Sequence, residues 1–198
     1  MAVDAKQVKE LRDISGAGVM DCKQALQETD GDMDSALRYL REQGVKIASK
    51  KAGREAGEGR VHSYIHGDGK IGVLVQVNCE TDFVARNDQF KDFCKKLAMQ
   101  IAASNPLVID REDLTEEQVR TEKEILLAQL KDSDKPDDIR EKIVSGRLEK
   151  YYAEVCLLDQ EWVHDSSEGT VGDVLADLVA TIGENMVVKN FARFEVGS

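Results

Sequence analysis

The first 45 residues carry three short apolar stripes, separated by breaks at 16–18 and 30–31. In the first stripe the apolar side chains recur every three residues, which predicts an amphipathic helix that Asp4 caps at its start. Its members are Val8, Leu11 and Ile14. The second stripe consists of Met20, Cys22, Ala25 and Leu26. A third helix is expected to begin after Asp32 and to stop at Gly44, burying Ala36, Leu37 and Leu40. The pattern predicts a small three-helix bundle.

Two strand-like runs follow, at 61–66 and 71–78. The segment between them is Gly67-Asp68-Gly69-Lys70, and its Asp-Gly pair is typical of a β-hairpin turn. Alternate positions of the second run are apolar, which predicts that one face of the strand is buried. These positions are Ile71, Val73, Val75 and Val77.

Helical patterns return after the strands. Spacings of three and four join Phe90, Phe93, Cys94, Leu97 and Ile101, in a helix expected to end near Asn105-Pro106. Three further helices are predicted, the first capped by Thr115 with Gln118, the second from about Asp137 to Leu158, and the third from Thr170 to Gly183. A final strand is expected over 186–196. Helices outnumber strands and the clear strand pair is a hairpin, so the predicted class is α+β, with helices packed on a small antiparallel sheet.

The segment at 46–59 is basic and then rich in Ala and Gly, with few large apolar side chains. Such a composition is typical of a linker, here with some helical character. The expected organisation is therefore a helical domain over 1–45, a linker over 46–59 and an α+β core over 60–198 that includes the C-terminal module.

Charge and hydropathy narrow the classes of function. The chain has 38 Asp and Glu against 27 Lys and Arg, a net charge of -11, which repels phosphate backbones. The basic stretch at 46–54 lacks the interleaved aromatic residues that stack on bases, so a solvated face or an acidic partner is favoured over RNA. No stretch approaches the roughly 18 apolar residues of a membrane span, and the first residues lack a signal-peptide pattern. We expect a cytoplasmic protein that binds neither nucleic acid directly nor a membrane.

The residue types that could support catalysis form no specific pattern. Gly16-Ala17-Gly18 lacks both the preceding strand and the Gly-Lys-Ser/Thr ending of a phosphate-binding loop. None of the three histidines has a partner at metal-ligand spacing, and the four cysteines form no C-x-x-C pair, so we expect no metal or cofactor and packed, reduced thiols. A hydrolase with a Cys79–His62 pair stays an alternative, because such partners meet only in the fold.

Thr81-Asp82-Phe83-Val84, hereafter the TDFV segment, places a large aromatic side chain beside a carboxylate. It lies where an apolar strand ends and a helix is about to begin, and rigid scaffolds often display functional side chains at such junctions. A phenylalanine taken alone is nevertheless more often buried than exposed. The local pattern leaves open whether Phe83 is a core residue or a contact residue.

Four stretches together resemble bacterial translation elongation factor Ts (EF-Ts), in that family's order. They are LRDISGAGVMDCKQA (11–25), GVLVQVNCETDFVARN (72–87), KIVSGRLEKYYAEVCLL (142–158) and GENMVVKNFARFEVG (183–197). The second stretch is highly specific, and the resemblance covers nearly the whole chain.

The resemblance implies a guanine nucleotide exchange factor, not an enzyme of covalent chemistry. Members bind the GTPase elongation factor Tu (EF-Tu) with GDP bound and accelerate GDP release. By this likeness the N-terminal bundle is similar to ubiquitin-associated (UBA) domains and docks on the GTPase domain through Arg12, Val19, Met20 and Lys23. Within the TDFV segment, Asp82 and Phe83 match the pair that inserts between helices of that domain and disturbs its Mg²⁺ and phosphate environment.

The sequence departs from the family's pattern in two places. The stretch 160–164, Gln-Glu-Trp-Val-His, differs from the usual Pro, Phe and Lys, and Val19 stands where Met is common; both departures bear on local contacts. The chain resembles the family's short form, which lacks a second core subdomain and can complete its structure by self-association, so we expect a homodimer. A second alternative to exchange is a general protein-binding module.

Overall fold

The computed structural model describes residues 3–130 and 136–197, which form eight α-helices, three 3₁₀-helices and three strands. The strands make one sheet in the order β1-β2-β3. The predicted α+β class with a small antiparallel sheet is therefore confirmed. The chain divides into two compact units, the first made of 1–62, 76–95 and 172–189, and the second of 63–75, 96–171 and 190–198.

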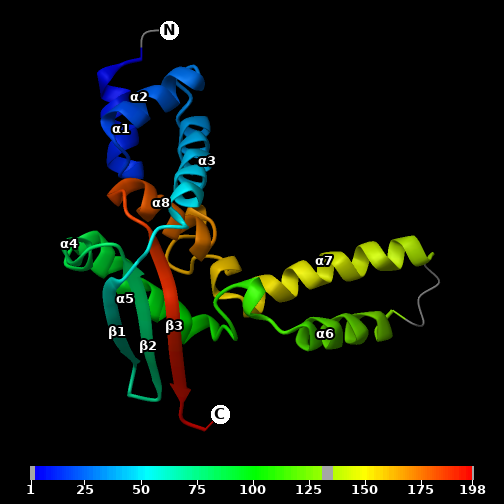
Figure 1. Ribbon diagram of the computed structural model, residues 1–198. Helices are drawn as coiled ribbons and strands as arrows, with labels where there is room; N and C mark the ends of the chain where they lie inside the picture. Colours follow the sequence, from blue (N-terminus) through cyan, green and yellow to red (C-terminus); the bar gives the residue numbers. More distant parts are fainter. Residues whose placement is uncertain (1–2, 131–135, 198) are drawn as a thin grey trace. The chain divides into compact units, whose positions relative to one another are not determined.

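The N-terminal bundle in the first unit consists of α1 (Ala5–Ser15), α2 (Val19–Glu28) and α3 (Met33–Lys51), drawn in blue to cyan in Figure 1. The predicted caps are confirmed, because the Asp4 carboxylate accepts the backbone N–H of Lys6 and the Asp32 carboxylate that of Ser35. The core of the bundle contains five fully buried side chains, Leu11, Cys22, Ala25, Leu26 and Ala36.

Gly44 was predicted to end the third helix, and this is wrong. Helix α3 continues through Gly44 to Lys51. A Cβ atom at Gly44 would lie 2.7 Å from the Asp177 carboxylate and 3.8 Å from the Ala180 side chain, both on α8 (Val171–Ile182). The glycine therefore permits close approach of two helices within the first unit and does not break one.

Two apolar residues assigned to the buried stripes are exposed instead. Ile14 is 61% exposed and Met20 is 72% exposed. Both lie beside the turn at 16–18, at the end of α1 and the start of α2. The small core is filled by Leu11 and by the α2 face that carries Cys22, so these two side chains remain at the surface.

The sheet consists of β1 (Glu58–His66), β2 (Ile71–Cys79) and β3 (Met186–Glu195). The predicted hairpin turn is confirmed, and Gly67 and Gly69 adopt φ values of 55° and 90° that favour glycine. Three of the four positions predicted by the alternation, Val73, Val75 and Val77, are buried, and the fourth, Ile71, is partly buried.

Two further helices follow β2, the single-turn α4 (Asp82–Ala85) and α5 (Asp88–Ser104). The stripe predicted for α5 is confirmed, because all five of its apolar residues are buried. The helix ends at Ser104, and the next residue, Asn105, takes a left-handed conformation (φ 47°) directly before Pro106.

In the second unit, α6 (Glu116–Ala128) and α7 (Asp137–Val155) lie side by side (Figure 1). The capping box of α6 is confirmed, with mutual hydrogen bonds between Thr115 and Gln118. The pair encloses a small cluster made of Leu126, Leu130 and Val144. Helix α7 ends at Val155, three residues before the predicted end, and a 3₁₀ turn (Leu157–Asp159) follows. The other 3₁₀ turns are Arg111–Asp113 and Ser166–Glu168.

The stretch that departs from the family's pattern, 160–164, places two of its side chains in the interior of the second unit and three at its surface. Trp162 and Gln160 are buried. The buried Gln100 side chain accepts the backbone N–H of Val163 at 2.9 Å and donates to the Gln160 side chain and the Glu161 carbonyl at 3.2 Å. The unusual residues therefore form their own satisfied polar contacts.

None of the helices within 3–130 and 136–197 is long and apolar enough to cross a membrane. The predicted boundaries of the helical domain, linker and core remain predictions.

Candidate functional site

The TDFV segment forms a capped turn between β2 and α5. Thr81 is extended (φ -129°, ψ 156°), and its hydroxyl accepts the backbone N–H of Val84 at 3.4 Å, as an N-cap does. The backbone N–H of Ala85 donates to the Thr81 carbonyl, which closes the single turn of α4. The sequence thus specifies a threonine-capped turn where the strand ends.

The turn points its two large apolar side chains in different directions. Val84 is buried, whereas Phe83 is 80% exposed. Asp82 is partly buried and pairs with Arg86 one turn later, at 2.9 Å between the carboxylate and the guanidinium. The interpretation of Phe83 as a core residue is therefore wrong, and its role as a contact residue stays a prediction.

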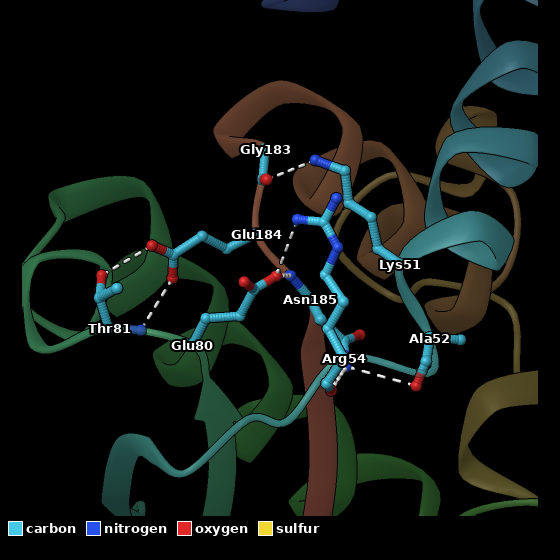
Figure 2. Close-up of polar contacts among 8 residues, drawn as sticks. All are labelled: Lys51, Ala52, Arg54, Glu80, Thr81, Gly183, Glu184 and Asn185. Carbon is cyan, nitrogen blue, oxygen red and sulfur yellow. Dashed lines mark hydrogen bonds and ion pairs between the residues drawn. The ribbon is translucent and has the colours of Figure 1, made fainter.

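A polar network holds this turn in the first unit (Figure 2). The Glu184 carboxylate accepts the Thr81 hydroxyl at 2.7 Å and the Thr81 backbone N–H at 3.0 Å. The neighbouring Glu80 carboxylate accepts the backbone N–H of Asn185 at 2.6 Å and lies 3.6 Å from the Arg54 guanidinium. Charge-assisted hydrogen bonds of this kind are stronger than neutral ones. The end of β2 and the start of β3 are thus tied together beside the TDFV segment.

Sequence reasoning missed these supporting residues. Glu80 lies between β2 and the TDFV segment, and Glu184 lies two residues before β3, but 103 positions separate Thr81 from Glu184. The usable signal was topological, because neighbouring antiparallel strands bring the end of one beside the start of the next. Only the pairing of β2 with β3 turns two unrelated carboxylates into one cluster.

The four N-terminal residues predicted to contact a partner are all exposed. Val19 and Met20 begin α2, Lys23 lies one turn further along, and Arg12 lies in the last turn of α1. Exposed Ile14 extends the apolar part of this surface. We call these five residues the bundle surface; it combines apolar side chains with two cations.

The cysteines do not provide an activated nucleophile. All four are buried free thiols. Burial and the nearby Glu184 carboxylate raise the pKa of Cys79 to about 11, and burial raises the pKa of Cys94 to about 12. Burial and the positive charges of Arg60 and Lys95 lower the pKa of His62. The Cys79 thiol donates to the Thr81 carbonyl at 3.2 Å and stays protonated at neutral pH, which disfavours the hydrolase alternative.

Within the part of the chain that the structure describes, no group of three or more His, Cys, Asp or Glu side chains is arranged to hold a metal ion. The chemistry available at the TDFV segment is therefore that of an exposed aromatic ring and a carboxylate on a braced turn.

Comparison with known proteins gives one consistent family. The model of the family described as Elongation factor TS matches residues 19–198. Elongation factor Ts of Caldanaerobacter subterraneus subsp. tengcongensis is 54% identical over 195 residues, covering 98% of this chain and 97% of the relative. Elongation factor Ts of Geobacter sulfurreducens is 54% identical over 197 residues, covering 100% and 91%. That of Moorella thermoacetica is 52% identical, covering 98% and 96%. The chain belongs to the elongation factor Ts family of translation elongation factors.

Proposed function

We propose that this protein is the guanine nucleotide exchange factor for EF-Tu: it binds EF-Tu·GDP in the cytoplasm and promotes GDP release, so that GTP can bind during the elongation stage of protein synthesis. The observation that carries the proposal is the exposure of Phe83: its side chain is 80% exposed, in a segment whose amino-acid sequence resembles that of the family. A large exposed aromatic on a braced turn has no packing role of its own and is suited to enter a partner.

In this mechanism the TDFV segment acts on the partner's nucleotide site. Phe83 inserts between helices of the GTPase domain, and Asp82 accompanies it, while Thr81 and Val84 shape the turn. The partner's Mg²⁺ neutralises crowded phosphate oxygens, so a displaced metal ion weakens the hold on GDP. A buried aromatic anchor contributes about 2 kcal/mol or more at an interface, which offsets distortion of the partner's loops.

The N-terminal bundle supplies the docking contact. We assign this role to Arg12, Val19, Met20 and Lys23, in a UBA-like domain over 1–45, joined by the linker at 46–59 to the core at 60–198. Support comes from the exposure of all four side chains and from the exposed Ile14 beside them. Apolar area flanked by cations matches an apolar patch with an acidic rim.

Binding linkage sets the direction of the cycle. A factor that weakens nucleotide binding to EF-Tu must itself bind more weakly when nucleotide is present, by the same factor. This protein therefore does not itself determine whether EF-Tu ends with GDP or GTP bound. Net exchange follows the excess of GTP over GDP in the cell.

The homodimer is proposed on an exposed apolar sheet face in the second unit. Ile65 lies on the same face as Gly72, because a Cβ atom at Gly72 would lie 3.2 Å from the Ile65 side chain. Leu74 shares that face by alternation. The backbone hydrogen bond from Val196 to Lys70 sets Phe194 opposite Gly72, on the same face again. Ile65, Leu74 and Phe194 are all exposed, and a second copy can cover them.

Sedimentation velocity tests the dimer. We expect the wild-type chain to sediment as a dimer at micromolar concentration and the Leu74→Ser/Phe194→Ser variant as a monomer. A wild-type monomer, or a double variant that remains fully dimeric, would refute this interface.

Stopped-flow measurement of GDP release tests the exchange function. EF-Tu is loaded with a fluorescent GDP analogue and mixed with excess GDP, with and without the chain. We expect release to accelerate with chain concentration until it saturates. Binding without acceleration would instead support the general protein-binding module.

A further inference from the structure

We propose that Glu184 is a positioning residue for nucleotide exchange: it fixes the TDFV segment in its exposed geometry without touching the partner. The proposal rests on the exchange function proposed above and adds to it a residue at the junction of α8 and β3. Its basis is the hydrogen-bond network of Figure 2.

Both carboxylate oxygens of Glu184 accept hydrogen bonds from the same residue, Thr81. One oxygen accepts the Thr81 hydroxyl at 2.7 Å, and the other accepts the Thr81 backbone N–H at 3.0 Å. A hydroxyl has a single hydrogen, so donation to Glu184 leaves the oxygen lone pairs of Thr81 free to accept the Val84 N–H. The carboxylate thereby sets the direction of the cap that begins α4.

The carboxylate is itself held on a rigid base. Asn185, the next residue, is buried and donates from its side-chain amide to the Arg54 carbonyl at 2.7 Å. Its backbone N–H donates to Glu80 at 2.6 Å. On the other side of Glu184, the Gly183 carbonyl accepts a hydrogen bond from the ammonium group of Lys51, the last residue of α3. Three consecutive residues, 183–185, therefore bond both the end of α3 and the end of β2.

The TDFV segment needs this external support. Helix α4 has four residues, far below the length at which an isolated helix is stable. Phe83 is mostly exposed, so packing does little to fix the turn from that side. If the Glu184 side chain is removed, the Thr81 hydroxyl and backbone N–H donate to water instead, and α4 opens more often. Phe83 must then be ordered when the partner binds, which costs conformational entropy at that step.

The first arm of the test is amide hydrogen exchange in the free chain, comparing Glu184→Ala, Glu184→Gln and the control Glu168→Ala, an exposed carboxylate on a different turn. We expect the Val84 and Ala85 amides to exchange about tenfold faster in Glu184→Ala, the size expected for loss of a charged hydrogen bond. Glu184→Gln keeps one acceptor and should restore much of the protection. Amides of α1 and α2 should not change in any variant.

The second arm is GDP release from EF-Tu, which separates positioning from docking. In Glu184→Ala we expect the maximal release rate to fall about tenfold, with the half-saturating concentration within about twofold of wild type. Glu184→Gln should recover most of the rate, and Glu168→Ala should match wild type. A purely structural role would instead lower the protection of all amides together.

The outcomes separate the two proposals. If the wild-type chain does not accelerate GDP release, the exchange function fails, and the hydrogen-exchange arm still decides whether Glu184 holds the turn. If release accelerates but Glu184→Ala leaves both the rate and the Val84 and Ala85 amides unchanged, the positioning role is overturned. Thr81→Val provides a second route, because it deletes the hydroxyl and leaves Glu184 intact. It should also speed exchange at Val84, and an unchanged Val84 amide would count against the cap.

Discussion

The bundle surface and the TDFV segment each expose a large apolar side chain, but the two are supported differently. Met20 is 72% exposed and Phe83 is 80% exposed. Met20 stands on a bundle whose core and the apolar side chains packed against it lie within residues 3–40. Phe83 stands on a single turn whose bracing comes from a carboxylate 103 positions beyond Thr81. Local sequence is enough to present the first, whereas the second depends on the rest of the first unit being folded.

This difference suggests a division of labour. A surface on a bundle with its own hydrophobic core can provide affinity even if neighbouring elements fluctuate. A short turn held by charge-assisted hydrogen bonds can deliver one side chain in a defined direction. We therefore expect changes in the bundle to alter the half-saturating concentration of the protein for GDP release. Changes in the TDFV segment should instead alter the maximal rate of GDP release.

The largest expected effect comes from Leu11→Ala, which removes a fully buried side chain from the core of the bundle. Such truncations cost about 2–5 kcal/mol. We expect the α1 and α2 amides to lose hydrogen-exchange protection while the Val84 and Ala85 amides keep theirs, and the half-saturating concentration for GDP release to rise. Leu107→Ala, at an exposed leucine, serves as the matched control. Equal loss of protection in α4 would contradict the independence of the two regions.

A smaller effect is expected from Met20→Ala, which trims the bundle surface and leaves its core intact. Loss of one exposed contact side chain at an interface costs about 1 kcal/mol, or about fivefold in affinity. A titration of GDP release should show a higher half-saturating concentration and an unchanged maximal rate. Gln27→Ala, an exposed residue on the same helix, should behave as wild type. A lower maximal rate for Met20→Ala would break the proposed division.

The elements themselves were accessible from sequence because their signals are local. The Asp-Gly turn, the alternating valines of β2 and the stripe of α5 each appear in the structure as predicted. Gly44 misled because glycine both ends helices and permits close helix packing, and only the presence of Asp177 and Ala180 on α8 tells these apart.

The candidate site was less accessible from sequence. Burial statistics alone favour a core Phe83, and the resemblance to the family is what pointed to a contact residue. Phe83 is exposed because the capped turn directs its side chain outward, and this direction cannot be read from the residue types alone. The support from Glu184 and Asn185 required the pairing of β2 with β3, a contact across the length of the chain.

The most direct test of the central claim is a titration of Phe83→Ala in the GDP-release assay with EF-Tu, beside a thermal unfolding curve of the same variant. Because the ring is largely exposed, we predict an unchanged unfolding midpoint. Loss of an anchor contributing about 2 kcal/mol predicts a maximal release rate about 30-fold lower than that of wild type. A folded Phe83→Ala variant that accelerates release as wild type does, or a variant that unfolds, would contradict the account.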